Sequence, residues 1–466
     1  MTDVSIATMA GMRQMRHTRR RLLANAASGG SLAGIAGGAA LAACDALSST
    51  PEADGKLALS KGPVTVVPFL SGITDAMRGD WDSQIAAVYR QRRPNVTVDL
   101  VPQTGPTVER VQKMTALMAS GSPLDLGDGP LGVRAMVAQS LADPAIEALI
   151  KRDKYDTKKY NQAHFQAGSQ LDGKIWALPY RYGGNAMCLA CNVNLFKEAG
   201  VALPPGDVAR PWSWDEFVTA LTRLTRRAGG EVSQFGLAGH AWIVGTWPPL
   251  WKADWISPDL KTITCDTKEM QDCYTKVGEL FTRHHVVPQP GEAARLFGAA
   301  NLFNTGKAAI LLFPPTGWRT YGIGAQVDYA FAPMPKVVQS VPDMGTGGIS
   351  LYRGSKVTGD AWDFLKFLIE ESRYAKLIGL LPAVVPDIEP WAKDQLKNVP
   401  SADTKALLGI VERAGTGSSM LAQHTKYADM TLVMNPILDD FMAGKIAPIQ
   451  MLQTLKPQLQ QIIDTK

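Results

Sequence analysis

The side chains of this chain that could do chemistry are aromatic and polar groups suited to recognising a small polar molecule. Residues 239–255 read GHAWIVGTWPPLWKADW, with four tryptophans in seventeen residues. Flat rings suit the apolar faces of pyranose sugars, while neighbouring polar groups hold the hydroxyls. Alternatively, three of these tryptophans form the buried face of a helix and do not contact a ligand, because Trp247, Trp251 and Trp255 are spaced by four residues. The Pro-Pro pair after Trp247 prevents a helix from running through that residue but lets one begin there. We therefore expect Trp251 and Trp255 in the core. Trp242 and Trp247 remain candidates for contact with a ligand.

The patterns expected of a catalytic or metal site are weak. A glycoside hydrolase needs paired carboxylates in its cleft, but Asp125 and Asp128 lie only three residues apart and no second acidic motif accompanies them. The sequence also has no nucleophile elbow and no metalloprotease helix. The adjacent pair His284-His285 would diverge on a helix, and no Cys/His cluster has zinc spacing. We expect no catalytic residue, no cofactor and no metal, with an exported carbohydrate-active enzyme kept as an alternative.

Four of the five cysteines fall in predicted elements of the fold. Cys188 and Cys191 lie in a predicted strand, where a spacing of three points the two thiols to opposite faces. This favours small core residues over a redox motif, which requires a helix start. Cys265 closes a predicted strand and Cys273 lies in a predicted helix over 268–284. A disulfide between them is compatible with an exported protein, and free thiols are the alternative.

The first 43 residues predict an export signal rather than part of the fold. A basic opening that contains Arg19-Arg20-Arg21 precedes a weakly apolar, Gly/Ala-rich run over 24–40, and Leu41-Ala42-Ala43-Cys44 follows. This order is that of a secretory signal. The final four residues resemble a bacterial lipobox, which implies cleavage before Cys44 and a lipid on its thiol. The twin-arginine and general secretion routes both stay open, as does an uncleaved anchor. Residues 44–62 then predict a solvated tether.

Removing the predicted signal changes the charge balance. The whole chain has 48 Lys and Arg against 43 Asp and Glu, and residues 1–43 hold five arginines and one acid. The remaining 43 basic and 42 acidic residues are nearly balanced. Nucleic acid is therefore not an expected partner.

About 420 remaining residues exceed what one hydrophobic core supports, so two domains are expected. Strands over 63–69 and 95–101 alternate with helices over 81–92 and 108–118, which is typical of an open parallel sheet with helices on both faces. Ligands on such sheets bind beyond the carboxyl ends of strands. The loops after two of the strands therefore supply candidate ligand-binding residues: Ser71, Thr74, Asp128 and Gly129.

A second candidate region is the stretch 171–184, LDGKIWALPYRYGG. It predicts a turn, a strand over 175–178 that stops at Pro179, and a polar-aromatic segment with Arg181 and Tyr182. A strand that ends at Pro and continues through Gly-Gly can bend between two packed bodies. We interpret this stretch as a hinge in the middle of a ligand cleft.

Several motifs resemble, in order, those of the family-1 extracellular solute-binding proteins of ABC importers. They are GKIWALPY at 173–180, NVNLFKEAG at 192–200, WSWDEF at 212–217, FNTGKAAI at 303–310 with Gly317-Trp318, and GTGG at 345–348. The resemblance covers nearly all of 63–463. It implies an α/β fold of the two-lobed periplasmic-binding-protein type, in which each lobe is an open sheet flanked by helices and crossing segments form the hinge. One departure is an extra residue before the acid in 123–126, which makes the assignments of Asp128 and Gly129 uncertain by about one residue.

The resemblance also implies boundaries and site residues. The N-terminal lobe is expected over 63–178 plus 336–382, and the C-terminal lobe over 179–335 plus 383–466. Trp318 corresponds to the tryptophan that stacks on the ligand in sugar binders. Gly347 and Gly348 correspond to glycines whose backbone amides meet ligand hydroxyls.

The resemblance implies a monomeric, exported, lipid-anchored protein on the outer face of the cytoplasmic membrane. It would capture a small polar solute, foremost a carbohydrate, by lobe closure and deliver it to the membrane permease of an ABC importer. Arg181 could instead neutralise a phosphate or carboxylate, so a solute of the glycerol-phosphate type is a further alternative.

Overall fold

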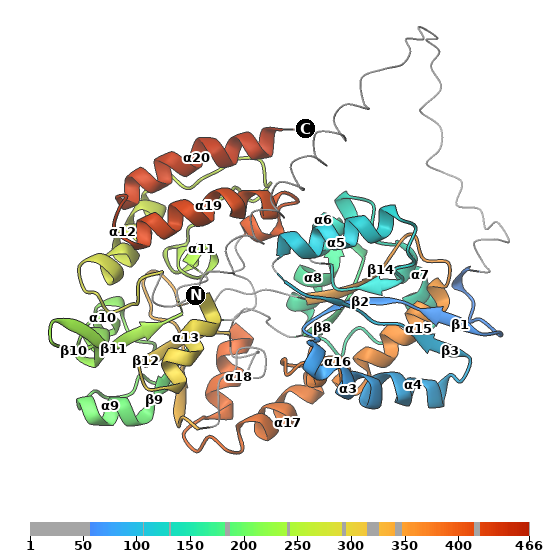
Figure 1. Ribbon diagram of the computed structural model, residues 1–466, viewed down its shortest axis with the longest axis horizontal. Coiled ribbons are helices and arrows are strands. Elements are labelled where there is room, and N and C mark those ends of the chain that lie inside the picture. The colour runs from blue at the N-terminus through green and yellow to red at the C-terminus, as the bar shows by residue number, and fades with distance from the viewer. Residues whose placement is uncertain are drawn as a thin grey trace, which may run out of the picture. The chain divides into compact units, whose positions relative to one another are not determined.

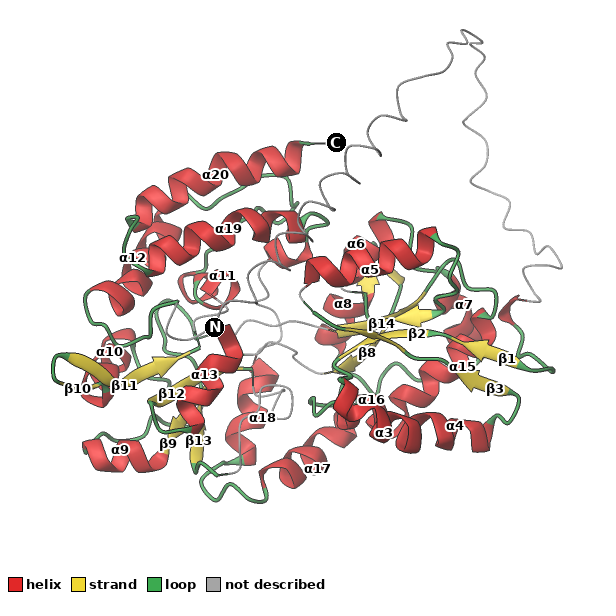
Figure 2. Ribbon diagram, in the orientation of Figure 1, coloured by secondary structure: helices red, strands yellow, loops and turns green. Residues whose placement is uncertain are grey.

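Two mixed sheets, each flanked by helices, organise this chain (Figures 1 and 2). The computed structural model describes residues 56–105, 107–129, 132–181, 187–239, 243–290, 295–314, 326–340, 347–413 and 420–465. The expected export signal, Cys44 and the tether up to residue 55 lie outside these ranges. We call the elements around the first sheet the first lobe and those around the second sheet the second lobe.

The first sheet has the strand order β4-β2-β5-β14-β8. Strand β2 pairs in parallel with β4 and β5, whereas β14 runs antiparallel to both β5 and β8. Strands β2, β4, β5 and β8 therefore end at one edge of the sheet, where β14 begins. The strands of this sheet are β2 (Pro68–Ser71), β4 (Val101–Gln103), β5 (Leu126–Gly127), β8 (Leu178–Arg181) and β14 (Gly347–Leu351).

Alternating side chains on β2 bury both faces of this sheet. Phe69 packs in a cluster with Met114 of α5 and Met136 of α6, whereas Leu70 packs in a cluster with Trp362 of α15. The helices of the first lobe are α3 (Arg78–Trp81), α4 (Ala87–Arg92), α5 (Thr107–Ala119), α6 (Gly132–Ala138), α7 (Ala145–Arg152), α8 (Gln162–Ser169), α15 (Thr358–Ile369) and α16 (Arg373–Leu377), with a π-helical turn over Asp82–Ala86 between α3 and α4. Two small ladders pair β1 (Val64–Val66) with β3 (Val96–Val98) and β6 (Gln170–Leu171) with β7 (Lys174–Ile175).

The second sheet has the strand order β10-β11-β12-β9-β13. Strands β11 and β12 are parallel, and β9 runs antiparallel to its neighbours β12 and β13. Strands β11, β12 and β13 therefore end at the edge where β9 begins. The strands are β9 (Cys188–Asn192), β10 (Arg226–Ala228), β11 (Glu231–Ala238), β12 (Ala308–Phe313) and β13 (Tyr329–Ala332).

The two cysteines of β9 lie on opposite faces, as the sequence predicts. Cys188 belongs to one core cluster and Cys191 to the other, and both thiols are free. Cys265 and Cys273 are also free, so the disulfide considered from the sequence is not formed. The helices of the second lobe are α9 (Val193–Ala199), α10 (Trp214–Leu224), α11 (Ile243–Thr246), α12 (Lys268–Thr282), α13 (Arg295–Asn304), α17 (Val385–Leu396), α18 (Thr404–Arg413), α19 (Tyr427–Met442) and α20 (Pro448–Asp464).

The chain passes between the two sheets three times. The first passage leaves β8 at Arg181 and reaches β9, and the second leaves β13 and reaches β14. The third follows α16, where Pro382 forms an isolated bridge with Arg181. In this third passage Leu381 packs in the core of the second lobe, whereas Ala383 packs in that of the first.

Two local predictions are corrected by the structure. The strand expected over 175–178 is not one strand, because Ile175 ends β7, and β8 begins at Leu178 and runs through Pro179 to Arg181. A proline is tolerated there because β8 is the last strand of its sheet. The predicted strand over 63–69 is divided into β1 and β2, which pair with different partners.

The end of the predicted tether, residues 56–62, is bound to the first lobe rather than solvated. Ser60 donates its amide and its hydroxyl to the buried carboxylate of Asp360, with the hydroxyl 2.6 Å from Oδ2. Lys56 forms an ion pair of 2.8 Å with Asp143. This segment of the chain therefore belongs to the folded lobe.

Candidate functional site

The site proposed here is the edge of the first sheet at which β2, β4, β5 and β8 end. Ser71, Gln103 and Arg181 are the last residues of their strands, and Asp128 directly follows β5. Gly347 begins the antiparallel strand β14 at the same edge. In open α/β sheets, ligands bind beyond the carboxyl ends of strands. Four polar side chains therefore lie where this fold places a ligand.

Asp128 is the centre of the hydrogen bonds at this edge. Its Oδ1 accepts from the Ser71 amide at 2.9 Å, and its Oδ2 accepts from the Ser71 hydroxyl and from the Tyr180 hydroxyl, the latter at 3.1 Å. The residue is only 8% exposed. The Asp128 carboxylate therefore joins the ends of β2, β5 and β8.

Gln103 supports the same carboxylate from β4. Its amide nitrogen donates to the carbonyls of Phe69 and Asp128 at 2.8 and 2.7 Å, and it lies 3.2 Å from Asp128 Oδ1. An amide has two hydrogens, so the third contact shares one of them. Gln103 thus fixes the backbone of Asp128 and that of the neighbouring strand β2.

Tyr374 connects this edge to α16. Its hydroxyl donates a hydrogen bond to the Ser71 carbonyl, and its ring lies 4.9 Å from that of Tyr180. Four residues beyond it, Ile378 begins the third passage and lies close to Gly72, where an added Cβ would meet its Cδ1 at 3.3 Å. The strand ends are therefore packed against the start of a passage between the lobes.

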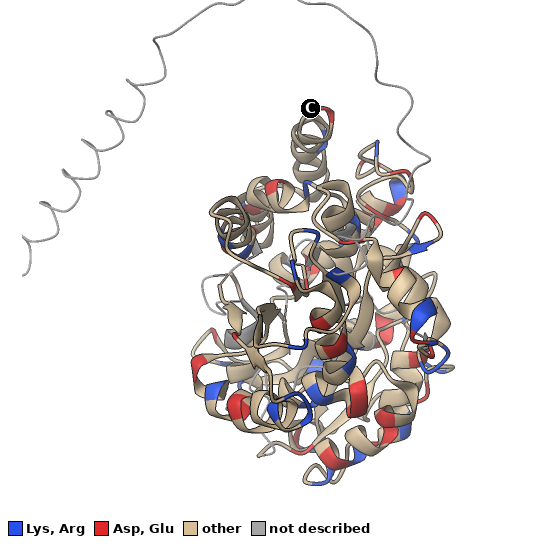
Figure 3. Cartoon of the chain, turned by 90° about the vertical axis from the view of Figure 1, so that its right-hand side faces the viewer, with Lys and Arg blue, Asp and Glu red and all other residues tan. Residues whose placement is uncertain are grey.

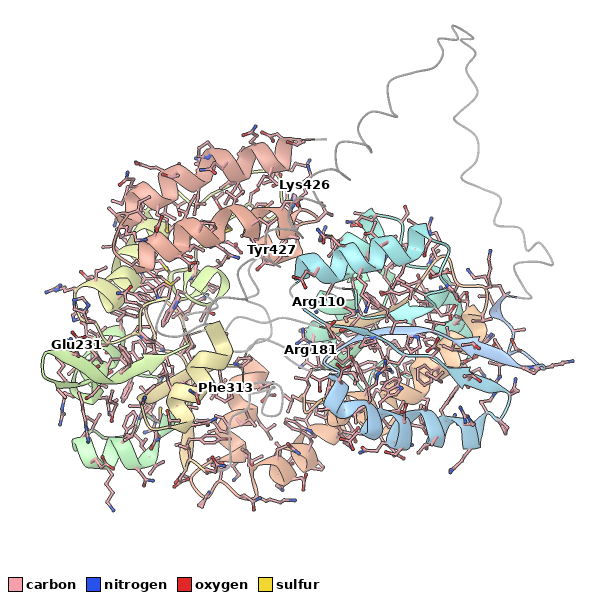
Figure 4. All side chains as sticks on the ribbon, viewed as in Figure 1. Arg110, Arg181, Glu231, Phe313, Lys426 and Tyr427 are labelled. Atoms are coloured by element: carbon pink, nitrogen blue, oxygen red, sulfur yellow. The ribbon has the colours of Figure 1, made fainter. Side chains whose placement is uncertain are left out.

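Arg181 lies across the beginning of β14. It is paired with Gly347, and a side chain on Gly347 would collide with the Arg181 Nε and with the Tyr180 ring. The Arg181 guanidinium also lies 5.8 Å from the centre of the Tyr180 ring. Figure 4 shows Arg181 and Arg110 of α5 at the same edge of the first lobe. The absence of a side chain at Gly347 thus makes room for the arginine.

Burial sets the protonation behaviour of the acid at this edge. It raises the pKa of the Asp128 carboxyl, while the two hydrogen bonds from Ser71 and the positive charge of Arg181 oppose that rise. The pKa of Tyr180 is also raised, because the ring is buried and faces Asp128. The Tyr180 hydroxyl therefore remains a hydrogen-bond donor at neutral pH.

The other predicted site residues are placed less directly. Thr74 is exposed and precedes the short helix η1 (Asp75–Met77). A side chain on Gly129 would collide with Met136, and one on Gly348 would meet Ala177 at 2.8 Å. Three predicted ligand contacts lie outside the described residues: Tyr182, Trp242 and Trp318.

Trp247 is a core residue in this structure, not a surface platform. It is 2% exposed and meets Trp214 edge-to-face at 5.7 Å. The expectation of ligand contact therefore requires correction, because Trp247, which directly precedes the 3-10 helix η4 (Pro248–Trp251), packs in the same cluster as Phe217. Trp251 and Trp255 are buried, as predicted.

Sequence reasoning missed Gln103, Tyr180 and Tyr374. The first could have been found, because it follows the predicted strand over 95–101 at the edge where open sheets bind ligands. Tyr180 was within the hinge motif but was not singled out. No sequence signal pointed to Tyr374, which lies 303 residues from its partner Ser71.

A cavity of about 540 Å³ lies elsewhere, between the first-lobe residues Ile85 and Leu377 and the α17 residue Trp391. It does not include the strand-end residues. We place the site at the strand ends because hydrogen-bonding side chains from four strands converge there.

A family model for bacterial extracellular solute-binding proteins matches residues 74–372. The chain belongs to this family. The match includes every strand of the second sheet and all of the first except β2. No match was found among curated protein sequences.

Solved structures of solute-binding proteins share the two-lobed α/β fold. The ABC substrate-binding protein Lmo0181 from Listeria monocytogenes, in complex with cycloalternan, has a TM-score of 0.68 at 16% identity, covering 87% of this chain and 100% of that one. Maltose-bound MalE3 from T. maritima has a TM-score of 0.67 at 16% identity, with 85% and 99% covered. The MalE domain from Bdellovibrio bacteriovorus bound to maltotriose has a TM-score of 0.67 at 18% identity, with 86% and 100% covered.

Within the described residues, no group of three or more His, Cys, Asp or Glu side chains could hold a metal ion. Among the described helices, none combines the length and the apolar character needed to span a bilayer. Basic and acidic residues are interspersed over the cartoon in Figure 3.

Proposed function

We propose that this protein is the substrate-binding component of an ABC importer and captures a carbohydrate between its two lobes. The observation that carries the proposal is the convergence of Ser71, Gln103, Asp128 and Arg181 at the strand ends of the first sheet. The passage from Arg181 leads directly to the edge of the second sheet at which β9 begins. Membership of the solute-binding family and the sugar-bound relatives support the same function.

The mechanism is closure of the lobes over the solute. A ligand shifts the population toward the closed form when it makes contacts there that the open form lacks. On the first lobe, Ser71, Arg181 and the amides at Gly347 and Gly348 supply hydrogen bonds to hydroxyls. Trp318, which lies in the sequence between two strands of the second sheet, supplies a stacking face from the other lobe. Thr74, Gly129, Tyr182 and Trp242 complete the proposed contacts.

The exported-enzyme alternative finds no support in the two nearby carboxylates. Asp125 is 1% exposed and accepts from the Val67 amide at 2.8 Å and the Ser355 hydroxyl at 2.6 Å. Asp128 is likewise occupied by hydrogen bonds from Ser71 and Tyr180. A hydrolase needs one carboxyl group free to transfer a proton and a second to act on the sugar or water.

A thermal-shift titration tests the function. The purified protein is heated with maltotriose, mannotriose, tagatose and glycerol 3-phosphate, and each sample is analysed for products. We expect at least one sugar to raise the melting temperature with a dependence on its concentration and without product formation. Stabilisation by glycerol 3-phosphate alone would favour the alternative solute class, and release of smaller sugars would favour an enzyme.

We also propose export and lipid attachment at Cys44, on the outer face of the membrane. The proposed lobes are 63–178 plus 336–382 and 179–335 plus 383–466, except that residues 56–62 and the end of β8 at 179–181 belong to the first lobe. A Cys44→Ser variant tests the anchor. We expect it to lose label from radioactive palmitate and to leave the membrane fraction. Retention in the membrane without label would contradict lipid attachment.

A further inference from the structure

We infer that Asp128 is a positioning residue that sets the hydrogen-bonding pattern of the strand-end edge, rather than an acceptor for the solute. This inference rests on the proposed function and deepens it. It departs from the expectation that Asp128 itself satisfies a solute hydroxyl.

The acceptor positions of Asp128 are already used within the first lobe. An ionised carboxylate has about four. Three are filled by the Ser71 amide, the Ser71 hydroxyl and the Tyr180 hydroxyl. The Gln103 amide lies 3.2 Å from Oδ1 and shares with it a proton that it also donates to a backbone carbonyl. With 8% of the residue exposed, a solute hydroxyl could bond to this carboxylate only by displacing one of these donors.

Asp128 determines how the hydroxyl groups at this edge are oriented, because the Ser71 and Tyr180 hydroxyls both donate their protons to it. A serine hydroxyl has one proton and two acceptor positions. Since the Ser71 proton is donated to Asp128 Oδ2, the Ser71 oxygen is left as an acceptor. Arg181 has only donors. The edge thus offers an acceptor and a donor, which matches the chemistry of sugar hydroxyls because each of them both donates and accepts.

The same carboxylate holds the strand ends against α16. Asp128 binds Ser71 and Tyr180, and Tyr374 of α16 contacts both of them, through the Ser71 carbonyl and through a ring contact of 4.9 Å. Loss of the Asp128 acceptors would therefore loosen two strand ends together.

Asp125 provides a matched control at the opposite end of β5. It is also buried and also accepts from one backbone amide and one serine hydroxyl, those of Val67 and Ser355. It differs in position, because its partners lie before β2 and after β14 rather than at the strand-end edge. Asp125→Asn should therefore reproduce the loss of a buried carboxylate without the loss of site geometry.

The test compares Asp128→Asn with Asp125→Asn by calorimetry, using maltotriose and a set of its monodeoxy analogues as probes. We expect both variants to lower the melting temperature. Only Asp128→Asn should weaken binding, by roughly tenfold or more, and by a similar factor for every probe that binds. A positioning residue affects all contacts at the edge, whereas a direct acceptor affects one hydroxyl.

Two results would overturn the inference. One is a loss of affinity in Asp128→Asn that disappears for a single deoxy analogue, which would reveal a direct contact. The other is an equal loss in Asp125→Asn, which would reveal a general effect of destabilisation. Tyr374→Phe, which removes a different donor from Ser71, should cause a smaller but equally uniform loss.

A further measurement separates this inference from the proposed function. If none of these sugars binds the unaltered protein, hydrogen exchange of the Ser71 amide in the ligand-free protein tests whether Asp128 positions Ser71. We expect Asp128→Ala to speed that exchange at least tenfold and Asp128→Asn to preserve protection, because asparagine keeps one acceptor oxygen. Unchanged protection in Asp128→Ala would refute the positioning role even without a ligand.

Discussion

Asp125 and Asp128 are two buried aspartates, close together in the sequence, that have different structural roles. Both carboxylates are buried, and burial raises the pKa of each. Asp125 ties the residue before β2 to the turn after β14, whereas Asp128 ties strand ends together at the ligand edge. Their roles differ because Asp125 contacts residues before β2 and after β14, whereas Asp128 contacts residues at the strand ends.

His164 on α8 makes the stability of the fold depend on pH. The side chain is 4% exposed, and burial lowers the pKa of the imidazole from 6.5 to about 4. The unfolded chain binds a proton at a higher pH than the folded one, so stability is present above pH 6.5 and is lost as the pH falls toward 4. Full loss would amount to about 3 kcal/mol.

We therefore expect His164→Gln to show a smaller loss of unfolding free energy between pH 7 and pH 4 than the unaltered protein, by about 2–3 kcal/mol. Urea unfolding, monitored by tryptophan fluorescence at pH 7 and at pH 4, measures the unfolding free energy of the variant and of the unaltered protein. Parallel pH profiles for the two proteins would contradict this role for His164.

Trp247 should act on stability rather than on recognition. Because it is buried against Trp214 and Phe217, Trp247→Ala removes a large ring from the second core. We expect a loss of about 3–5 kcal/mol in unfolding free energy, with a smaller loss for Trp247→Phe. An unchanged unfolding midpoint together with weaker sugar binding would instead place the ring at the ligand.

At the scale of elements, α10 could be predicted from a capping sequence at its start and from the periodic spacing of its apolar residues. Ser213 accepts from the Glu216 amide, and Glu216 in turn accepts from the Ser213 amide at 2.7 Å, which forms a capping box. Phe217, Leu221 and Leu224 are buried, as their spacing predicts. The helix is thus specified by contacts within four residues and by one apolar face.

Ser213→Ala should cost the protein about 1 kcal/mol, since it leaves a helix N-terminus without its cap. Thr222→Ala is a control in the same helix, because Thr222 is exposed and bonds only to the Val218 carbonyl, and alanine favours the helix. Denaturant unfolding compares the two variants. A loss as large in Thr222→Ala would mean that the cap is not the cause.

For the whole molecule, the segment 56–62 decides where the folded body begins. Ser60 supplies both its amide and its hydroxyl to Asp360, whose side chain is fully buried and also pairs with Arg93 at 2.8 Å. Removing Ser60 would leave the Asp360 carboxylate with fewer donors in a site without water access, at a cost of about 1–3 kcal/mol.

A chain that starts at residue 63 should accordingly melt several degrees below one that starts at residue 56, by roughly 2–4 °C for each kcal/mol lost. Ser60→Ala in the longer chain should produce part of the same decrease. Differential scanning calorimetry gives the comparison. Equal melting temperatures for the two chains would show that the segment is a tether after all.

Much of the fold follows from local sequence. The helices over 81–92, 108–118 and 268–284, the strand through Cys188 and Cys191, and the cap at Ser213 were predicted because each depends on periodicity or on neighbours within a few residues. The course of β8 through Pro179 was not predicted, because a proline is acceptable only on an edge strand and edge position is a property of the sheet.

For the site, the sequence by itself determined that the segments after two predicted strands supply Ser71 and Asp128. Arg181 was a candidate from the hinge motif, but its position at the end of β8 was not predicted. Only the tertiary structure decided what these residues do, because hydrogen bonding in a buried site depends on groups brought together from distant segments. Tyr374 reaches Ser71 across 303 residues, and the donors that occupy the Asp128 carboxylate come from three strands, β2, β4 and β8. The burial of Trp247 has the same origin, since a tryptophan is suited both to a sugar and to a core, and packing alone distinguishes the two.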